Sequence, residues 1–167
     1  MFQDSRINKV LYGGDYNPEQ WPEEIWEEDM RLFKLAGIDE VTLNVFSWAA
    51  LQPSEDTYNF EKLDKIMDLV EANGLKVFLA TSTAAHPAWM AKRHPDILRT
   101  EFSGMKRKFG SRHNSCQNSP TYQKYSVLLA KKLAERYGER ECVIGWHICN
   151  EYGGECYCEN CEKQFRV

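Results

Sequence analysis

The segment WPEEIWEEDMRLFKLAGIDEVTLNVF, residues 21–46, decides the fold class because it contains one complete helix-to-strand unit. Pro22 and the two glutamates after it are typical of the first turn of a helix. Five apolar residues of this helix are expected on one side: Ile25, Trp26, Met30, Phe33 and Leu35. Gly37 ends the predicted helix, since glycine readily adopts the left-handed conformation that closes many helices. Residues 38–46 alternate in polarity and are rich in β-branched side chains, which predicts a strand.

The same helix-to-strand unit recurs along the chain. Apolar runs predict further strands at residues 10–16, 75–80 and 143–148. Helices are predicted at residues 60–71 and 120–137, each followed closely by a glycine, and another amphipathic helix begins near Glu159. A long loop is expected from Thr81 to Ser119. Strands and helices therefore alternate, with one long loop before the third helix.

Alternating strands and helices, with no tight hairpin signal between strands, predict a parallel sheet with right-handed crossovers. Polar or small residues directly follow the predicted strands, namely Asp15 to Asn17, Ser47 and Trp48, Thr81 to Thr83, and Asn150 and Glu151. This is typical of an α/β fold of the (β/α)8 TIM-barrel type, whose active site lies at the C-terminal strand ends. Four of eight strands are recognisable, so we expect residues 1–167 to be the N-terminal half of a barrel domain, a fragment. A doubly wound sheet is the alternative, but no glycine-rich dinucleotide fingerprint follows the first strand.

The composition excludes several classes of protein. With 43% hydrophobic and 28% charged residues, the chain has the composition of a globular domain. A net charge of -4, with lysines and arginines scattered among acidic residues, argues against a nucleic acid partner. No apolar run approaches the roughly 20 residues that span a bilayer, so no membrane partner is expected. Asp4, Arg6 and Lys9 interrupt the place of a signal peptide's apolar region, and we expect a cytoplasmic protein.

The run Trp146-His147-Ile148-Cys149-Asn150-Glu151-Tyr152 contains the first candidate for catalysis. In barrel glycosidases an Asn-Glu pair at the end of the fourth strand supplies the general acid/base and an asparagine that hydrogen-bonds the sugar 2-hydroxyl. The alternative is that Glu151 is a solvated or salt-bridged residue. The position of the pair at a strand end favours catalysis. His147 is either a supporting residue of this site or a hydrogen-bonded core histidine.

Cysteines form the second candidate site. Cys156, Cys158 and Cys161 follow the spacing Cys-x-Cys-x-x-Cys, and three thiolates in a short loop need one further ligand to make a closed tetrahedral zinc site. A disulfide framework is not expected, because the chain shows no secretory signal. Reduced surface cysteines without a metal are the alternative. Cys142 and Cys149 are expected to be small buried residues.

Five stretches of the chain resemble glycoside hydrolase family 42. They are Tyr12-Gly13-Gly14-Asp15-Tyr16-Asn17-Pro18-Glu19-Gln20-Trp21-Pro22, Phe46-Ser47-Trp48-Ala49, Pro87-Ala88-Trp89, Gly110-Ser111-Arg112, and the run from Trp146 to Tyr152. The resemblance extends from about Val10 to the last residue. It implies a retaining β-galactosidase that hydrolyses terminal β-D-galactose from β-galactosides, with a barrel followed by two smaller domains and a trimeric assembly.

The resemblance also implies roles for individual residues. Glu151 corresponds to the acid/base, Asn150 and Arg112 correspond to sugar-binding residues, and Trp48 is expected near the galactose site. The family places a zinc cysteine shortly after its Gly-Ser-Arg motif, so Cys116 is the expected fourth ligand beside Cys156, Cys158 and Cys161, with His113 as the alternative. The nucleophile, a second glutamate late in the barrel, is expected beyond Val167, so residues 1–167 alone are predicted to be inactive.

Three other functions stay open on the sequence alone. The first is a barrel glycosidase that acts on a different β-linked sugar. The second is a zinc-stapled binding module without catalysis, which the absence of a basic surface disfavours. The third is a half-barrel that pairs with a second copy of itself through its open strand edges.

Overall fold

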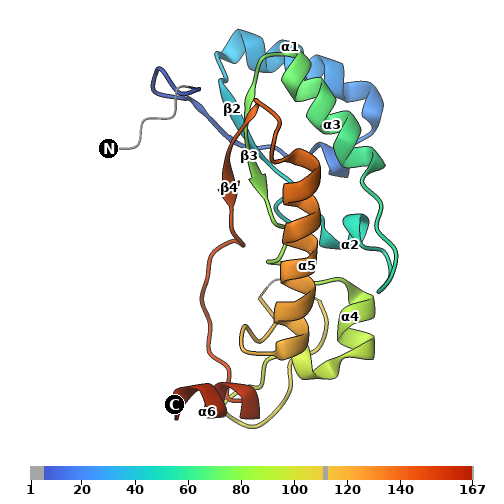
Figure 1. Ribbon diagram of the computed structural model, residues 1–167, viewed down its shortest axis with the longest axis vertical. Helices are drawn as coiled ribbons and strands as arrows, with labels where there is room; N and C mark the ends of the chain where they lie inside the picture. The colour runs from blue at the N-terminus through green and yellow to red at the C-terminus, as the bar shows by residue number, and fades with distance from the viewer. Residues whose placement is uncertain (1–5, 111–112, 167) are drawn as a thin grey trace.

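The computed structural model describes residues 6–110 and 113–166, and its core element is a parallel sheet of four strands (Figure 1). The strands are β1 (Gly13–Asp15), β2 (Glu40–Leu43), β3 (Lys76–Ala80) and β4 (Val143–His147). They lie side by side in the order of the chain, and each neighbouring pair is parallel. The parallel sheet predicted from the sequence is confirmed.

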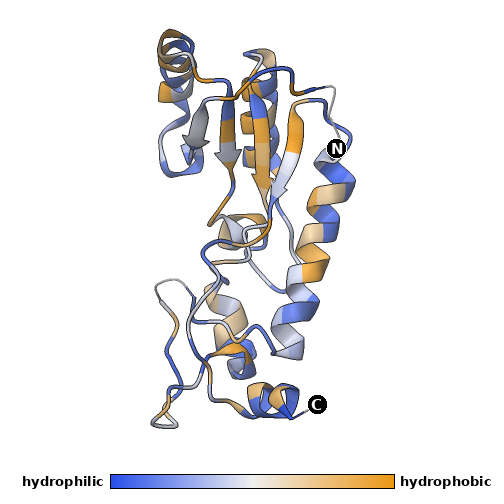
Figure 2. Cartoon of the chain, turned by 90° about the vertical axis from the view of Figure 1, so that its left-hand side faces the viewer, coloured by the Kyte–Doolittle hydropathy of each residue, from blue (hydrophilic) through white to orange (hydrophobic). Residues whose placement is uncertain are grey.

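Three helices connect the successive strands, and they share one face of the sheet. They are α1 (Trp26–Ala36), α3 (Glu61–Ala72) and α5 (Pro120–Tyr137). The face turned toward the viewer in Figure 2 carries no helix in the described part of the chain. A doubly wound sheet has helices on both faces and a reversal in strand order, so this alternative does not apply. The topology is that of the first four units of a (β/α)8 barrel.

The loop predicted from Thr81 to Ser119 contains regular structure, so that prediction was wrong in part. The shorter elements of the chain are η1 (Pro18–Gln20), η2 (Glu23–Ile25), α2 (Trp48–Leu51), α4 (Ala88–Arg93), η3 (Pro95–Ile97) and α6 (Glu159–Phe165). Of these, α4 and η3 lie inside the predicted loop, and Leu98 pairs with Ser115 in an isolated antiparallel bridge. Both helical elements are too short for their apolar residues to show a helical period.

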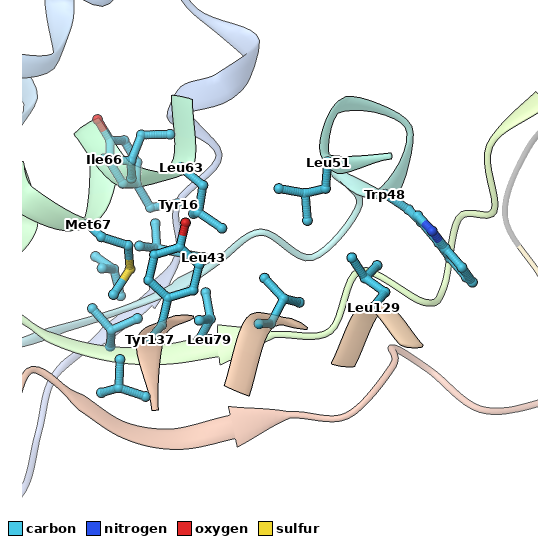
Figure 3. Packing of buried hydrophobic residues seen from close by; sticks show 14 of the residues in the cluster. Tyr16, Leu43, Trp48, Leu51, Leu63, Ile66, Met67, Leu79, Leu129 and Tyr137 are labelled. Atoms are coloured by element: carbon cyan, nitrogen blue, oxygen red, sulfur yellow. The ribbon is translucent and has the colours of Figure 1, made fainter. Parts of the chain in front are cut away.

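A layer of apolar side chains holds the helices to the sheet. Alternate residues of β2 and β3 turn toward the helices, and Val41, Leu43, Val77 and Leu79 are each at most 1% exposed. They belong to the same buried cluster as Met67 and Val70 of α3 and Leu129, Leu133 and Tyr137 of α5, part of which Figure 3 shows. Burial of one such aliphatic side chain contributes roughly 1.5–3 kcal/mol. This layer fixes where the strand ends lie.

Helix α1 ends where predicted, but it begins at Trp26 instead of near Pro22, because residues 23–25 form η2, and it does not bury the whole predicted face. Trp26 and Met30 are buried, whereas Ile25 and Leu35 are 38% and 72% exposed, so these two were wrongly assigned to the buried side. The reason is the helical period, because Leu35 follows Phe33 by only two residues and so lies on another side of the helix. Gly37 ends α1 with a positive φ of 72°, as predicted.

Helix α5 begins with a side-chain cap. The Oγ atom of Ser119 accepts a hydrogen bond from the backbone N–H of Tyr122 (3.2 Å), and Pro120 occupies the first helical position. Its 18 residues make it the longest described helix. Neither α5 nor any other helix in the described residues combines the length and the apolar character that crossing a bilayer requires.

Candidate functional site

The C-terminal ends of the four strands meet at one end of the sheet. Hydrogen bonds join neighbouring strand ends there: the side-chain amide of Asn44 donates to the carbonyl oxygen of Ala80 (3.1 Å), and the Ser82 hydroxyl donates to the carbonyl oxygen of Asn44. On the next strand, the backbone N–H of Cys149 donates to Thr81 Oγ1 (3.2 Å). The residues that follow β2, β3 and β4 are therefore held together by direct contacts.

The backbone at this end of the sheet adopts left-handed conformations at four residues other than glycine. The φ angles are 70° at Asn44, 61° at Ser82, 60° at Cys149 and 47° at Glu151. Each such residue costs of order 1–3 kcal/mol, and strained positions of this kind concentrate at functional sites. Such residues occur just after β2, after β3 and after β4. They mark this end of the sheet as the candidate site.

Asn150 and Glu151 lie where the sequence predicted them. They follow β4 by three and four residues, in a stretch without helix or strand, and the Glu151 side chain is exposed. Asp15 ends β1 and is exposed as well. An exposed carboxyl group at a strand end is accessible to a substrate and to water, which a proton-transferring residue requires.

Arg112 lies outside the described residues, so the structure does not place it. The described residues resume at His113. The backbone N–H of His113 donates to the carbonyl oxygen of Ala84 (3.5 Å), which lies four residues after β3. The segment that begins at His113 is thus attached to the loop that follows β3.

Trp48 lies at the start of α2, but its side chain has no exposed surface. Its indole N–H donates to Gln52 Oε1 (2.8 Å), and its ring packs against Tyr122 with the centroids 5.9 Å apart. A ring that is fully enclosed in this way cannot contact a sugar directly. We therefore place Trp48 in the packing behind the strand ends.

His86 is a buried residue near the site, and no role was predicted for it. Its Nδ1 atom lies 2.7 Å from Ser115 Oγ, and its ring packs edge-on against Phe109. Burial lowers the pKa of His86 to about 4, so the ring is neutral at neutral pH. His86 thus contacts Phe109 before Arg112 and Ser115 after it. Nothing in the sequence pattern indicates this burial.

Four cysteines form a cluster next to the candidate site. The Sγ atoms of Cys116, Cys156, Cys158 and Cys161 all lie within 4.8 Å of one another. Cys116 Sγ is 3.5 Å from the sulfurs of both Cys158 and Cys161, which is far beyond the length of a disulfide bond of about 2.05 Å. Four thiolates around one ion at about 2.3 Å would lie roughly 3.8 Å apart, so the donor set fits a tetrahedral metal site.

The surroundings of the cluster also suit a cation. Although burial opposes it, hydrogen bonds from the Cys161 backbone and from neighbouring thiols lower the pKa of Cys158 to about 7. The side-chain amide of Asn118 donates to Cys161 Sγ (3.4 Å), as outer residues of metal sites commonly do. His113 does not belong to the group, whose members among the described residues are all cysteines. Cys142 and Cys149 are buried, as predicted, and lie outside it.

Comparisons with known proteins match almost the whole chain to one family. The glycoside hydrolase family 42 model, described as beta-galactosidase, matches residues 15–167. Beta-galactosidase BgaP of Planococcus sp. (strain L4) is 64% identical over 165 residues, which are 98% of this chain and 24% of that protein. Beta-galactosidase LacZ of Lactobacillus acidophilus is 49% identical over 162 residues, which are 97% of this chain and 24% of that protein.

The fold is similar to that of a solved enzyme structure. The crystal structure of beta-galactosidase from Bacillus circulans sp. alkalophilus superposes with a TM-score of 0.94 and 59% sequence identity. The superposition covers 97% of this chain and 24% of that chain. This chain therefore spans about a quarter of the length of the proteins it matches.

Proposed function

Because the chain belongs to glycoside hydrolase family 42, we propose that it supplies the N-terminal half of the catalytic barrel of a retaining β-galactosidase. The substrate class is a β-galactoside, from which the whole enzyme releases terminal non-reducing β-D-galactose. The observation that carries this proposal is the position of Glu151, which is exposed and in a left-handed conformation four residues after β4. The strand β4 belongs to a parallel sheet whose strands lie in chain order.

Glu151 is the proposed general acid/base. In a retaining mechanism its protonated carboxyl group donates to the glycosidic oxygen while a second carboxylate, roughly 5–5.5 Å away, attacks the anomeric carbon. The ionised Glu151 then removes a proton from the water that cleaves the galactosyl intermediate. We assign the second carboxylate to the part of the relatives' length that this chain does not cover, so residues 1–167 alone are proposed to be inactive.

Asn150 and Arg112 are the proposed sugar-binding residues. Asn150 directly precedes Glu151, where its amide can hydrogen-bond the 2-hydroxyl of the galactose, a contact that strengthens in the transition state. Arg112 offers fixed N–H donors to sugar hydroxyls. Trp48 supports this end of the site from behind through its contact with Tyr122, so its proposed role is indirect.

The four-cysteine cluster is the proposed zinc site, formed by Cys116, Cys156, Cys158 and Cys161. A closed set of four thiolates leaves no coordination position open to substrate, so the ion is structural. When bound, it stabilises a loop that has few apolar side chains of its own. The rest of the mechanism depends on Glu151 and its neighbours. The trimer that the family resemblance implies stays a prediction for the whole protein.

The full-length protein tests this proposal with a pair of substrates. We expect it to hydrolyse an aryl β-galactoside much faster than the corresponding β-glucoside and to release β-galactose first, as followed by NMR. A preference for the glucoside would favour the other barrel glycosidases. No hydrolysis of either substrate, with the zinc site intact, would favour the binding module instead.

A further inference from the structure

The loop that carries Glu151 is anchored at both of its ends. At its start, the backbone N–H of Cys149 donates to Thr81 Oγ1 (3.2 Å). At its end, the backbone N–H of Tyr157 donates to the carbonyl oxygen of Thr100 (2.9 Å), and the flanking cysteines join the four-cysteine cluster. Residues 150–157 between these anchors form neither helix nor strand. The middle of the loop therefore needs another contact to hold it.

Arg99 lies beneath the middle of this loop. Its side chain is only 3% exposed, an unusual degree of burial for an arginine. Its Nε atom donates to the carbonyl oxygen of Ser115 (2.8 Å). Its backbone N–H donates to the carbonyl oxygen of Asn114 (2.9 Å). Its buried Nη1 atom has no hydrogen-bond partner among the described residues. A buried charged group with an unused donor adds little to stability, which points to another reason for its presence.

The guanidinium group of Arg99 lies directly against Gly154. A Cβ atom added to Gly154 would lie 2.0 Å from Arg99 Nη1 and 3.3 Å from its Cζ. Gly154 also has a positive φ of 80°, which favours glycine for a second reason. Arg99 thus occupies the space that any other side chain at position 154 would need, three residues after Glu151.

We propose that Arg99 is a positioning residue for the acid/base glutamate. Its guanidinium group links the segment after Arg112, through Ser115, to the loop after Glu151, through Gly154. It thereby fixes the direction from which Glu151 reaches the glycosidic oxygen. This inference rests on the proposed function of Glu151, and it adds a residue that contacts no sugar itself.

The test uses the full-length enzyme and two substrates that differ in their need for an acid. A phenyl galactoside requires protonation of its leaving group, whereas a dinitrophenyl galactoside does not. We expect Arg99→Met to lower kcat/KM, which reports the step that releases the leaving group, about 10- to 100-fold on the phenyl substrate and less than about 3-fold on the dinitrophenyl substrate, because general acid catalysis contributes about 10² to 10⁴-fold. Arg99→Lys should restore part of the loss. The metal content should stay unchanged.

Two glycine variants keep the test decisive if Arg99→Met does not fold. Gly154→Ala displaces the guanidinium group and should give the same selective loss on the phenyl substrate. Gly104→Ala is the matched control, since Gly104 has a similar φ of 84° but no atom within 4 Å of the added Cβ. It should leave both rates unchanged.

Several results would overturn the proposal. Equal losses on both substrates, no loss on either, or loss of the metal from Arg99→Met would each do so, because they would give Arg99 a general structural role, no role or a role in the metal site. Glu151→Gln is measured in parallel. If that variant also discriminates against the phenyl substrate while Arg99→Met and Gly154→Ala do not, only the positioning role fails. If Glu151→Gln keeps full activity, both proposals fail.

Discussion

Cys116 and Cys158 are 42 positions apart in the sequence, yet their Sγ atoms lie 3.5 Å from each other. This contact joins two segments with proposed roles in one reaction. Cys116 lies four residues after Arg112, and Cys158 lies seven residues after Glu151. An ion held by the cluster would therefore fix the distance between the segment proposed to bind the sugar and the loop proposed to donate the proton.

The first prediction concerns this cluster. Protein purified without chelator should contain about one zinc ion per chain, since four thiolates form a complete ligand set. Cys158→Ser should lose the metal and lower Tm, as metal analysis and thermal unfolding would show. Cys142→Ser is the control, because Cys142 lies outside the cluster, and it should keep the metal. A Cys158→Ser protein with full metal content would contradict the assignment.

The second prediction concerns the buried face of α1. Met30 is 3% exposed and Leu35 is 72% exposed, although both were expected on the buried side. Met30→Ala should lower the free energy of unfolding by about 2–5 kcal/mol through the cavity it leaves. Leu35→Ala should change it by less than about 0.5 kcal/mol. Denaturant unfolding of both variants measures the difference, and equal effects would mean that the helix is rotated relative to the structure.

The third prediction concerns His86 and the stability of the fold below neutral pH. Burial lowers the pKa of His86 to about 4 from its ordinary value of 6.5, so below pH 6.5 the unfolded chain binds a proton that the folded chain does not. Stability should therefore fall as the pH drops from 6.5 to about 4, by up to about 3 kcal/mol from this residue. The Tm of His86→Gln should depend less on pH in this window. An unchanged pH dependence would contradict the burial of a neutral imidazole.

The fourth prediction concerns Glu55, which affects the stability of the fold at lower pH than His86 does. Hydrogen bonds from Tyr125, Arg93 and His94 lower the pKa of the Glu55 carboxyl to about 2. A lowered carboxyl pKa stabilises the fold above the unfolded pKa, and this stabilisation is lost as the pH falls from about 4.5 to about 2. Tm measured against pH should show a smaller slope there for Glu55→Gln. Glu135→Gln, which breaks only an exposed pair with Lys131, should keep the slope of the parent.

The sequence predicted most of the fold because the signals involved are local. Helix α3 and strand β3 follow from a helical apolar period, a glycine stop and a buried run, all within about 20 residues. Helix α4 was missed because six residues after a proline are too few to show a period. The exposure of Leu35 was missed because residues were assigned to one side without checking the angle between them.

The candidate site was predictable only in part. The spacing of the cysteines between Cys156 and Cys161 indicated a metal site without any structure, because ligands in one short loop leave a sequence pattern. The position of Glu151 at a strand end was predictable because the apolar run that forms the strand comes just before it in the sequence. The burial of Arg99 and of His86 depends on segments that pair only in three dimensions, so no local pattern reveals it. The enclosure of Trp48 likewise depends on α5, more than 70 positions later in the chain.

The most direct test of the account is azide rescue of Glu151→Gln in the full-length enzyme with a dinitrophenyl galactoside as substrate. This leaving group departs without a proton, so the galactosyl intermediate still forms, and azide then replaces the water that Glu151 would have activated. We predict faster turnover with azide and β-galactosyl azide as the product, identified by NMR. Turnover that azide does not change, or near-normal hydrolysis of lactose by this variant, would contradict the assignment of Glu151 as the acid/base.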